Sequence, residues 1–205
     1  MKNIIIVLAF LTIGCRSNTY TIPKDDYKLI PYKGNEELVF KSNKGDVDTV
    51  FLQGTKRFFS PINQWSYPIK NCEHFSIVSK RSDPTIMNVK GRYLDSLNLI
   101  TLFNDGDTKI EIEFTAKTAW FYGDKIYTKQ EFLELKNTIL DIGVHRYNDI
   151  VILHPNWTIG DNKQGNIVER PNSIIKLYWS GEKGIVRYDK PNNEYWELMK
   201  IIASD

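Results

Sequence analysis

Short segments in which apolar and polar residues alternate recur along the chain, and each predicts an antiparallel strand with one buried face. The clearest pair comprises residues 98–103 and 109–115, joined by Asn104-Asp105-Gly106-Asp107. Asp-Gly is a favoured pair in tight hairpin turns. In the return strand one side carries Ile110, Ile112 and Phe114, and the other carries Lys109, Glu111 and Glu113. This pattern predicts a hairpin whose second strand is half buried.

Two further regions combine β-favouring residues with turn residues. Residues 38–43 and 47–52 flank Lys44-Gly45-Asp46, which predicts a second hairpin. At the end of the chain, three β-rich segments are separated by Gly-rich and Pro-Asn turns. They predict a meander with strands at residues 173–180, 185–189 and 194–201.

The segment before the meander carries one strand signal and one helix signal. Residues 150–153 read Ile-Val-Ile-Leu, a compact apolar run typical of a well-buried strand. Thr128-Lys129-Gln130-Glu131 has the spacing of a capping box, in which threonine and glutamate side chains satisfy the first amides of a helix. The apolar residues between 132 and 142 also suit extended chain, so we expect one turn of helix at most, followed by a strand. Residues 160–166 are a loop by composition.

These elements together predict a mainly β fold. Hairpins occur in both halves of the chain and no helical period is sustained, so we expect an antiparallel sheet that curls into a sandwich or an open barrel, with at most one short helix. The length suits one domain with its own core, expected at residues 32–205.

The beginning of the chain is typical of a secretion signal. A lysine at position 2 precedes an unbroken apolar run at residues 4–11, which is too short to cross a bilayer as a helix. Thr12-Ile13-Gly14-Cys15 resembles the lipobox read by lipoprotein signal peptidase, apart from Thr12 where that motif usually has leucine. This resemblance implies a signal peptide at residues 1–14, lipid on Cys15 and a lipidated tether at residues 15–31. The alternative is an ordinary signal peptide that contains a cysteine.

Charge and cysteine content narrow the function classes. Lys and Arg total 27 against 25 Asp and Glu, for a net charge of +2, and no basic stripe predicts nucleic-acid binding. The chain has two cysteines, and if Cys15 carries lipid then Cys72 has no intrachain disulfide partner. We therefore expect Cys72 to be a small buried residue instead of a reactive thiol.

Three stretches of the mature chain carry a resemblance to a known group. They are residues 30–43, Tyr147-Asn148-Asp149-Ile150, and Tyr178-Trp179-Ser180 together with Gly184-Ile185-Val186-Arg187-Tyr188. These stretches resemble small, poorly characterised envelope lipoproteins of Bacteroidetes. The resemblance implies export, lipidation and the outer membrane of a Gram-negative host, and it brings no established activity or catalytic residue.

Motifs for catalysis or metal binding are absent from the sequence. The three histidines, His74, His145 and His154, are not spaced as local metal ligands, so no metal, cofactor or catalytic residue is predicted. Glu111 and Glu113 share a strand face, but a polar outer face is normal for such a strand.

Aromatic residues provide the one binding signal. They make up 13% of the chain, and the predicted meander contains Tyr178, Trp179, Tyr188, Tyr195 and Trp196. Alternation places Trp179 and Trp196 on the core side, and Tyr178 and Tyr195 on the exposed side, where they become the candidate ligand-facing aromatics.

These observations leave two functions open. The first is a non-catalytic, membrane-anchored lipoprotein that binds a glycan or an envelope protein, or acts as an accessory module. The alternative is an envelope hydrolase with an unrecognised active site.

Overall fold

The computed structural model describes residues 18–63, 69–80, 96–116, 119–123, 125–155 and 173–203. The predicted signal peptide, Cys15 and the predicted loop at residues 160–166 lie outside these residues. No helix in the described ranges is both long and apolar enough to span a bilayer.

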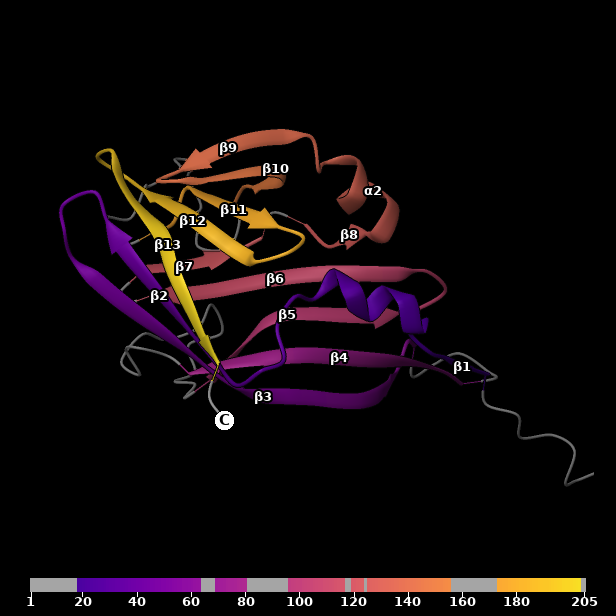
Figure 1. Cartoon of the computed structure of the whole chain (residues 1–205). Coiled ribbons are helices and arrows are strands. Elements are labelled where there is room, and N and C mark those ends of the chain that lie inside the picture. Colours follow the sequence, from indigo (N-terminus) through magenta and orange to yellow (C-terminus); the bar gives the residue numbers. More distant parts are fainter. Residues whose placement is uncertain are drawn as a thin grey trace, which may run out of the picture.

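The described chain is mainly β, which confirms the predicted fold class (Figure 1). Its strands are β1 Asn18–Tyr20, β2 Glu36–Ser42, β3 Val47–Pro61, β4 Lys70–Lys80, β5 Ser96–Asn104, β6 Thr108–Ala116, β7 Ala119–Tyr122, β8 Tyr127–Thr128, β9 Thr138–Ile142, β10 His145–Leu153, β11 Lys176–Ser180, β12 Gly184–Lys190 and β13 Glu194–Ala203. Two short helices accompany them, the 3-10 helix η1 at Lys24–Leu29 and the α-helix α2 at Lys129–Glu134.

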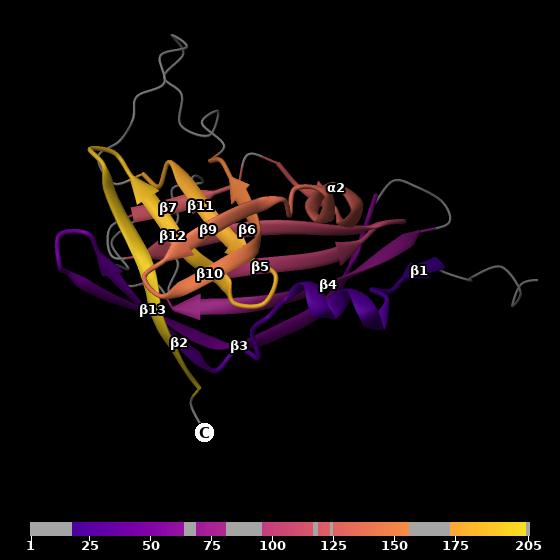
Figure 2. The same ribbon diagram turned by 45° about the horizontal axis from the view of Figure 1, so that its top comes forward.

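One continuous sheet forms the framework. Its strands follow the order β7-β6-β5-β4-β3-β2-β13-β12-β11-β10-β9, while β1 pairs with β4 and β8 pairs with β6. Neighbouring strands are antiparallel except for the parallel pair of β1 and β4. The sheet curls into an incomplete barrel, with the meander over one part of it and α2 at one end (Figure 2).

The long strand β3 causes this curl. Its residues 47–51 pair with β2, whereas Leu52 and residues 55–61 pair with β4, and the register shifts between Leu52 and Thr55. Gly54 lies in this irregular stretch with a φ of 108°, a backbone conformation that favours glycine. The two halves of β3 therefore belong to two differently oriented parts of the sheet.

The inner face of the curled sheet holds one hydrophobic core. Phe40, Phe114 and Tyr188 come from three distant strands, and their ring centroids lie 5.3 to 5.9 Å apart. Trp179 is fully buried and packs against Phe132 of α2. Burial of these large rings supplies much of the free energy that holds the two parts of the sheet together.

The predicted hairpins are present. β2 and β3 form the first one, β5 and β6 form the second, and β11 to β13 form the meander. In β6 the inner residues are buried and the outer residues are half buried, as the alternation predicts. The capping box at Thr128 and Glu131 also forms, and α2 is followed by strand β9.

Two predictions about residues 15–31 need correction. The described part of the expected tether packs on the domain, and it contains η1, a second short helix where one at most was expected. Apolar side chains from this segment, at Ile22, Leu29 and Ile30, are buried in the core. Packing therefore starts before residue 32, because the folded sheet provides partners that the local sequence does not reveal.

Glu73 of β4 attaches this segment to the sheet. Its carboxylate is fully buried and accepts hydrogen bonds from the Ile22 amide at 2.8 Å, the Tyr27 hydroxyl at 2.8 Å and the Arg57 guanidinium at 2.5 Å. Burial acts to raise the pKa of Glu73, but the three hydrogen bonds outweigh it and hold that pKa below its usual value. One carboxylate thus joins β3, β4 and the N-terminal segment.

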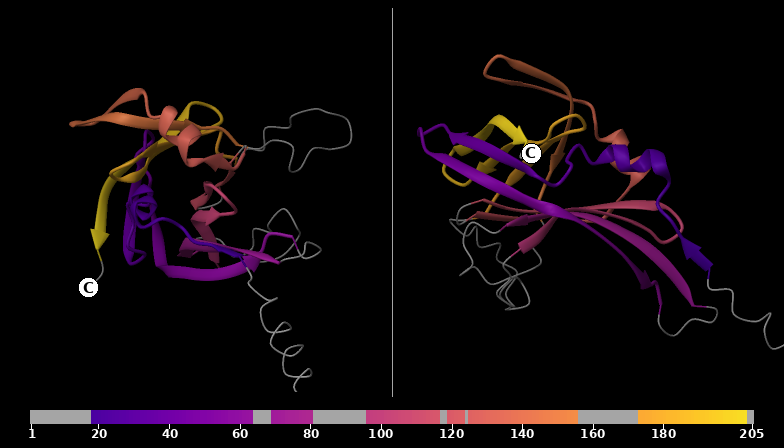
Figure 3. Two further views of the ribbon diagram at one scale, coloured as in Figure 1. Left: turned by 90° about the vertical axis from the view of Figure 1, so that its right-hand side faces the viewer. Right: turned by 60° about the horizontal axis from the view of Figure 1, so that its bottom comes forward.

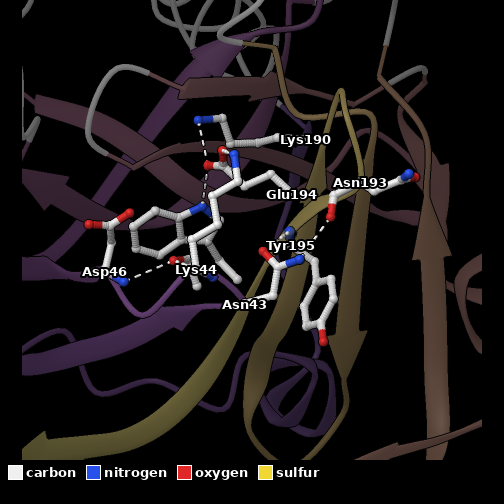
Figure 4. Close-up of polar contacts among 9 residues, drawn as sticks. Asn43, Lys44, Asp46, Lys190, Asn193, Glu194 and Tyr195 are labelled. Atoms are coloured by element: carbon white, nitrogen blue, oxygen red, sulfur yellow. Dashed lines mark hydrogen bonds and ion pairs between the residues drawn. The ribbon is translucent and has the colours of Figure 1, made fainter.

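A second carboxylate, Glu194, joins the β2–β3 turn to the β12–β13 turn, where these strands end (Figure 4). It accepts hydrogen bonds from Lys44, Lys190 and the indole nitrogen of Trp196, each at 2.9 Å. Asn43 of the β2–β3 turn also donates to the Asn193 carbonyl oxygen. Partial burial acts to raise the pKa of Glu194, but the bonds from Lys190, Lys44 and Trp196 lower it to about 2.

Replacing this carboxylate should destabilise the fold in a pH-dependent way. We expect Glu194→Gln to lower the free energy of unfolding by about 1–2 kcal/mol at neutral pH, because charge-assisted hydrogen bonds are lost. The folded pKa of about 2 lies below the ordinary value of 4.5, so this stabilisation is complete above the ordinary value and is lost as pH falls towards 2. Urea unfolding at neutral pH and near pH 3 should show the difference shrinking. Asp25→Asn is the control, since its ion pair with Lys28 is exposed.

Candidate functional site

The two predicted ligand-facing tyrosines lie on the outer face of the meander, around one guanidinium group. The carbon at the centre of the Arg187 guanidinium is 4.2 Å from the ring centroid of Tyr195 and 5.3 Å from that of Tyr178. Arg187 also forms ion pairs with Asp189 and Glu197. The structure therefore brings Tyr178 and Tyr195 together around Arg187, a neighbour that alternation along each strand does not predict.

The predicted exposure of Tyr178 is wrong. Its exposed fraction is 8%, and its hydroxyl donates to Asp189 Oδ2 at 2.8 Å. Burial and this hydrogen bond raise the pKa of Tyr178 to about 12. Tyr195 is half buried under Arg187. Neighbouring side chains on a sheet face cover one another, which alternation alone does not predict.

The tryptophan side chains on the opposite face of these strands are buried, as predicted. Trp179 is fully buried and Trp196 has an exposed fraction of 3%, so both tryptophans belong to the core. The outer cluster around Arg187 has most of its polar groups paired internally. Few polar groups of this cluster are therefore left to form hydrogen bonds with a ligand.

Glu111 and Glu113 lie half buried on the outer face of β6. Glu111 accepts a hydrogen bond from the Tyr122 hydroxyl at 3.0 Å. Burial and the nearby Glu111 raise the pKa of Tyr122 to about 12. Glu111 thus has a structural partner on β7, as expected for a polar strand face.

Cys72 is buried and free, as the sequence predicts, but it has a neighbour that the sequence analysis missed. The His74 Nε2 atom lies 3.0 Å from Cys72 Sγ and 2.7 Å from Ser60 Oγ. The imidazole ring is stacked between Phe58 and Phe103. Burial between these rings lowers the pKa of His74, which favours the neutral imidazole. The i, i+2 spacing of Cys72 and His74 on a strand was the available signal.

The other two histidines, His145 and His154, are exposed. Within the described parts of the chain, His, Cys, Asp and Glu side chains form no group of three that could hold a metal ion.

A cleft of about 690 Å³ lies beside α2, and several polar groups converge on it. Its lining residues come from three separate elements: the start of η1, the β5–β6 turn, and α2 with its N-cap residue. Figure 1 shows where these elements lie in the fold. It is lined by Pro23, Asp26, Asn104, Gly106, Asp107, Thr108, Thr128, Lys129, Gln130, Leu133 and Glu134. We refer to this feature as the η1–α2 cleft.

Buried polar residues form the floor of the cleft. Asp26 has an exposed fraction of 3%, and its two carboxylate oxygens accept hydrogen bonds from Thr108 Oγ1 at 2.6 Å and from Lys129 Nζ. The side-chain amide of Asn104 donates to the Thr21 carbonyl oxygen, and its oxygen accepts from the Gly106 amide. These bonds fix the floor by joining residues that are far apart in the sequence.

The rim of the cleft is polar and exposed. Asp107, Gln130 and Glu134 contribute two carboxylates and an amide, and Leu133 contributes an apolar side chain. Lys129 is the one basic residue among the lining residues, and Asp26 accepts its hydrogen bond. The rim therefore carries excess negative charge and planar polar groups, which suit hydroxyl or amine groups of a ligand better than anions.

Sequence signals identified the parts of this cleft but not the cleft itself. The Asp-Gly turn at residues 104–107 and the capping box at Thr128 were both predicted locally. The turn and the capping box form a cleft only together with η1, a helix within the segment that was predicted to be a tether.

The ion pair between the buried Asp26 and the half-exposed Lys129 should lose different amounts of stability when each partner is removed. Lys129→Met leaves the buried Asp26 carboxylate without its countercharge, and we expect a loss of about 2–4 kcal/mol in the free energy of unfolding. Asp26→Asn leaves a half-exposed lysine that water can solvate, and we expect a loss of about 1 kcal/mol. Urea unfolding of both variants measures the two losses. A larger loss for Asp26→Asn would contradict the described geometry.

Comparison with known protein families, characterised proteins and solved structures finds no match for this chain. Its function is accordingly argued from the cleft and from the sequence signals at its beginning.

Proposed function

We propose that this protein is an envelope lipoprotein, held by lipid on Cys15 at the outer membrane of a Gram-negative bacterium, and that its domain is a non-catalytic binding module. The proposed ligand is a short neutral or amine-bearing glycan, which binds in the η1–α2 cleft. The apolar run and Gly14-Cys15 support the anchor. The resemblance to Bacteroidetes lipoproteins supports the same location.

The observation that carries the binding proposal is the fixed polar floor of the cleft. Ligand sites combine a concave shape with a few polar groups that are held in place before the ligand arrives. Asp26, Asn104 and Thr108 are buried; Thr108 donates a hydrogen bond to Asp26, and Asn104 donates one to the Thr21 carbonyl oxygen. These bonds hold the segments that carry the rim residues in fixed positions. A preformed site loses less conformational entropy when a ligand binds.

The chemistry of the rim favours a glycan within this general class. Hydroxyl groups of sugars both donate and accept hydrogen bonds. The Asp107 carboxylate can accept from them, and so can the Glu134 carboxylate, one oxygen of which already accepts from the Gln130 side-chain amide at 2.8 Å. Leu133 adds an apolar surface for the carbon skeleton of a sugar ring. The excess negative charge disfavours acidic polysaccharides.

The anchor can be tested in the native cell. We expect Cys15→Ser to abolish lipidation and to move the protein from the membrane fraction to the soluble fraction, because the thiol that receives the lipid is missing. Fractionation with metabolic labelling by a fatty acid measures both effects. A variant that stays on membranes and is cut as before would contradict the anchor.

The cleft can be tested by binding measurements on a panel of neutral, amino-sugar and acidic oligosaccharides. We expect neutral or amine-bearing members to bind, and the double variant Asp107→Asn with Glu134→Gln to bind at least tenfold more weakly, since two acceptor carboxylates are lost. Asp141→Asn with Glu182→Gln is the matched control, because both residues are exposed and lie outside the cleft lining.

Two outcomes would contradict this assignment. Equal binding by both double variants would exclude the cleft as the site. Release of new reducing ends from a bound oligosaccharide would instead support the hydrolase alternative.

A further inference from the structure

The distance between the proposed lipid and the folded domain is very short. Only Arg16 and Ser17 separate Cys15 from Asn18, the first residue of β1. An extended chain spans at most ~3.6 Å per residue, so the Cα atoms of Cys15 and Asn18 lie no more than about 11 Å apart. A domain attached in this way has to lie close to the bilayer surface.

The position of β1 decides which end of the domain lies there. β1 runs parallel to β4, with Asn18 opposite Lys70. The Ile62 amide, just after β3, donates to the Lys70 carbonyl oxygen at 2.8 Å. The start of β1, the end of β3 and the start of β4 therefore form one row across the sheet (Figure 3).

This end of the domain also exposes apolar side chains. Phe59, Ile62 and Ile69 have exposed fractions of 51%, 40% and 47%. The Lys70 ammonium group lies 5.9 Å from the ring centroid of Tyr20. Apolar side chains with a flanking lysine and tyrosine are the composition that favours contact with a membrane interface.

We propose that this end, defined by Tyr20, Phe59, Ile62, Ile69 and Lys70 and called the anchor end, rests on the lipid bilayer. The occupant of this apolar surface is thus the membrane that carries the lipid anchor. The proposal depends on lipid at Cys15, as proposed above. It adds a defined orientation of the domain to that anchor.

The β9–β10 hairpin provides a matched comparison. It points away from β1 in both of the first two views (Figures 1 and 2). Ile139 and Val144 in this hairpin have exposed fractions of 54% and 94%, so they are apolar and accessible but remote from the anchor. An exposed apolar residue alone therefore does not predict which end contacts lipid.

The orientation can be measured on the mature-length chain, residues 15–205, coupled through Cys15 to a maleimide lipid in vesicles of phosphatidylethanolamine and phosphatidylglycerol. Cys72 is buried, so we expect its thiol to stay unreacted. An azide-bearing amino acid at Ile69, or at Val144, carries a fluorophore, and brominated lipids quench it. We expect quenching at least threefold stronger at position 69. Equal quenching, or stronger quenching at position 144, would overturn the proposal.

A second measurement uses a maleimide lipid with a single acyl chain, which alone holds a protein only marginally. We expect Ile62→Asp with Ile69→Asp to leave the vesicles several-fold faster than wild type, and Ile139→Asp with Val144→Asp to leave at the wild-type rate. Circular dichroism checks that both variants are folded. Equal release rates for the two variants would contradict the proposed orientation but not the lipid anchor. The Cys15→Ser experiment tests the anchor separately.

Discussion

The architecture depends on a change of partner within one strand, β3. Gly54 makes this change, and its amide donates to the Gly34 carbonyl oxygen at 2.5 Å. A Cβ atom on Gly34 would lie 2.8 Å from the Gly54 carbonyl carbon, so the two backbones meet where no side chain fits. Because one half of β3 pairs with β2 and the other half pairs with β4, the sheet curls around one core. The anchor end and the cleft depend in addition on β4, which pairs with β1 and holds the η1 segment through Glu73.

The parts of the fold that could be predicted from the sequence are those with local causes. The Asp-Gly turn between β5 and β6 and the capping box of α2 are fixed by residues a few positions apart. Alternation correctly assigned Trp179 and Trp196 to the core, because successive side chains in a strand face opposite ways.

The rest depends on contacts between residues far apart in the chain. Ile22 is bonded to Glu73, and Asp26 is bonded to Thr108 and Lys129, so a polar stretch that resembles a tether becomes part of the domain. The η1–α2 cleft was missed for the same reason. Tyr178 shows a related limit, since alternation gives the side of a sheet but not the neighbours that cover a residue there.

The parallel pairing of β1 with β4 has a mechanical consequence. If Cys15 carries the lipid proposed above, a pull from it enters the domain at Asn18, the first residue of β1, and its component along β1 loads the pairing with β4. Force in that direction shears all three rungs between β1 and β4 at once, instead of opening them one after another. The bonds of Ile22 and Tyr27 to Glu73 form a second point of resistance behind them. In the proposed lipid-anchored arrangement, tension from the membrane would enter the sheet at β4 through a strand of three residues.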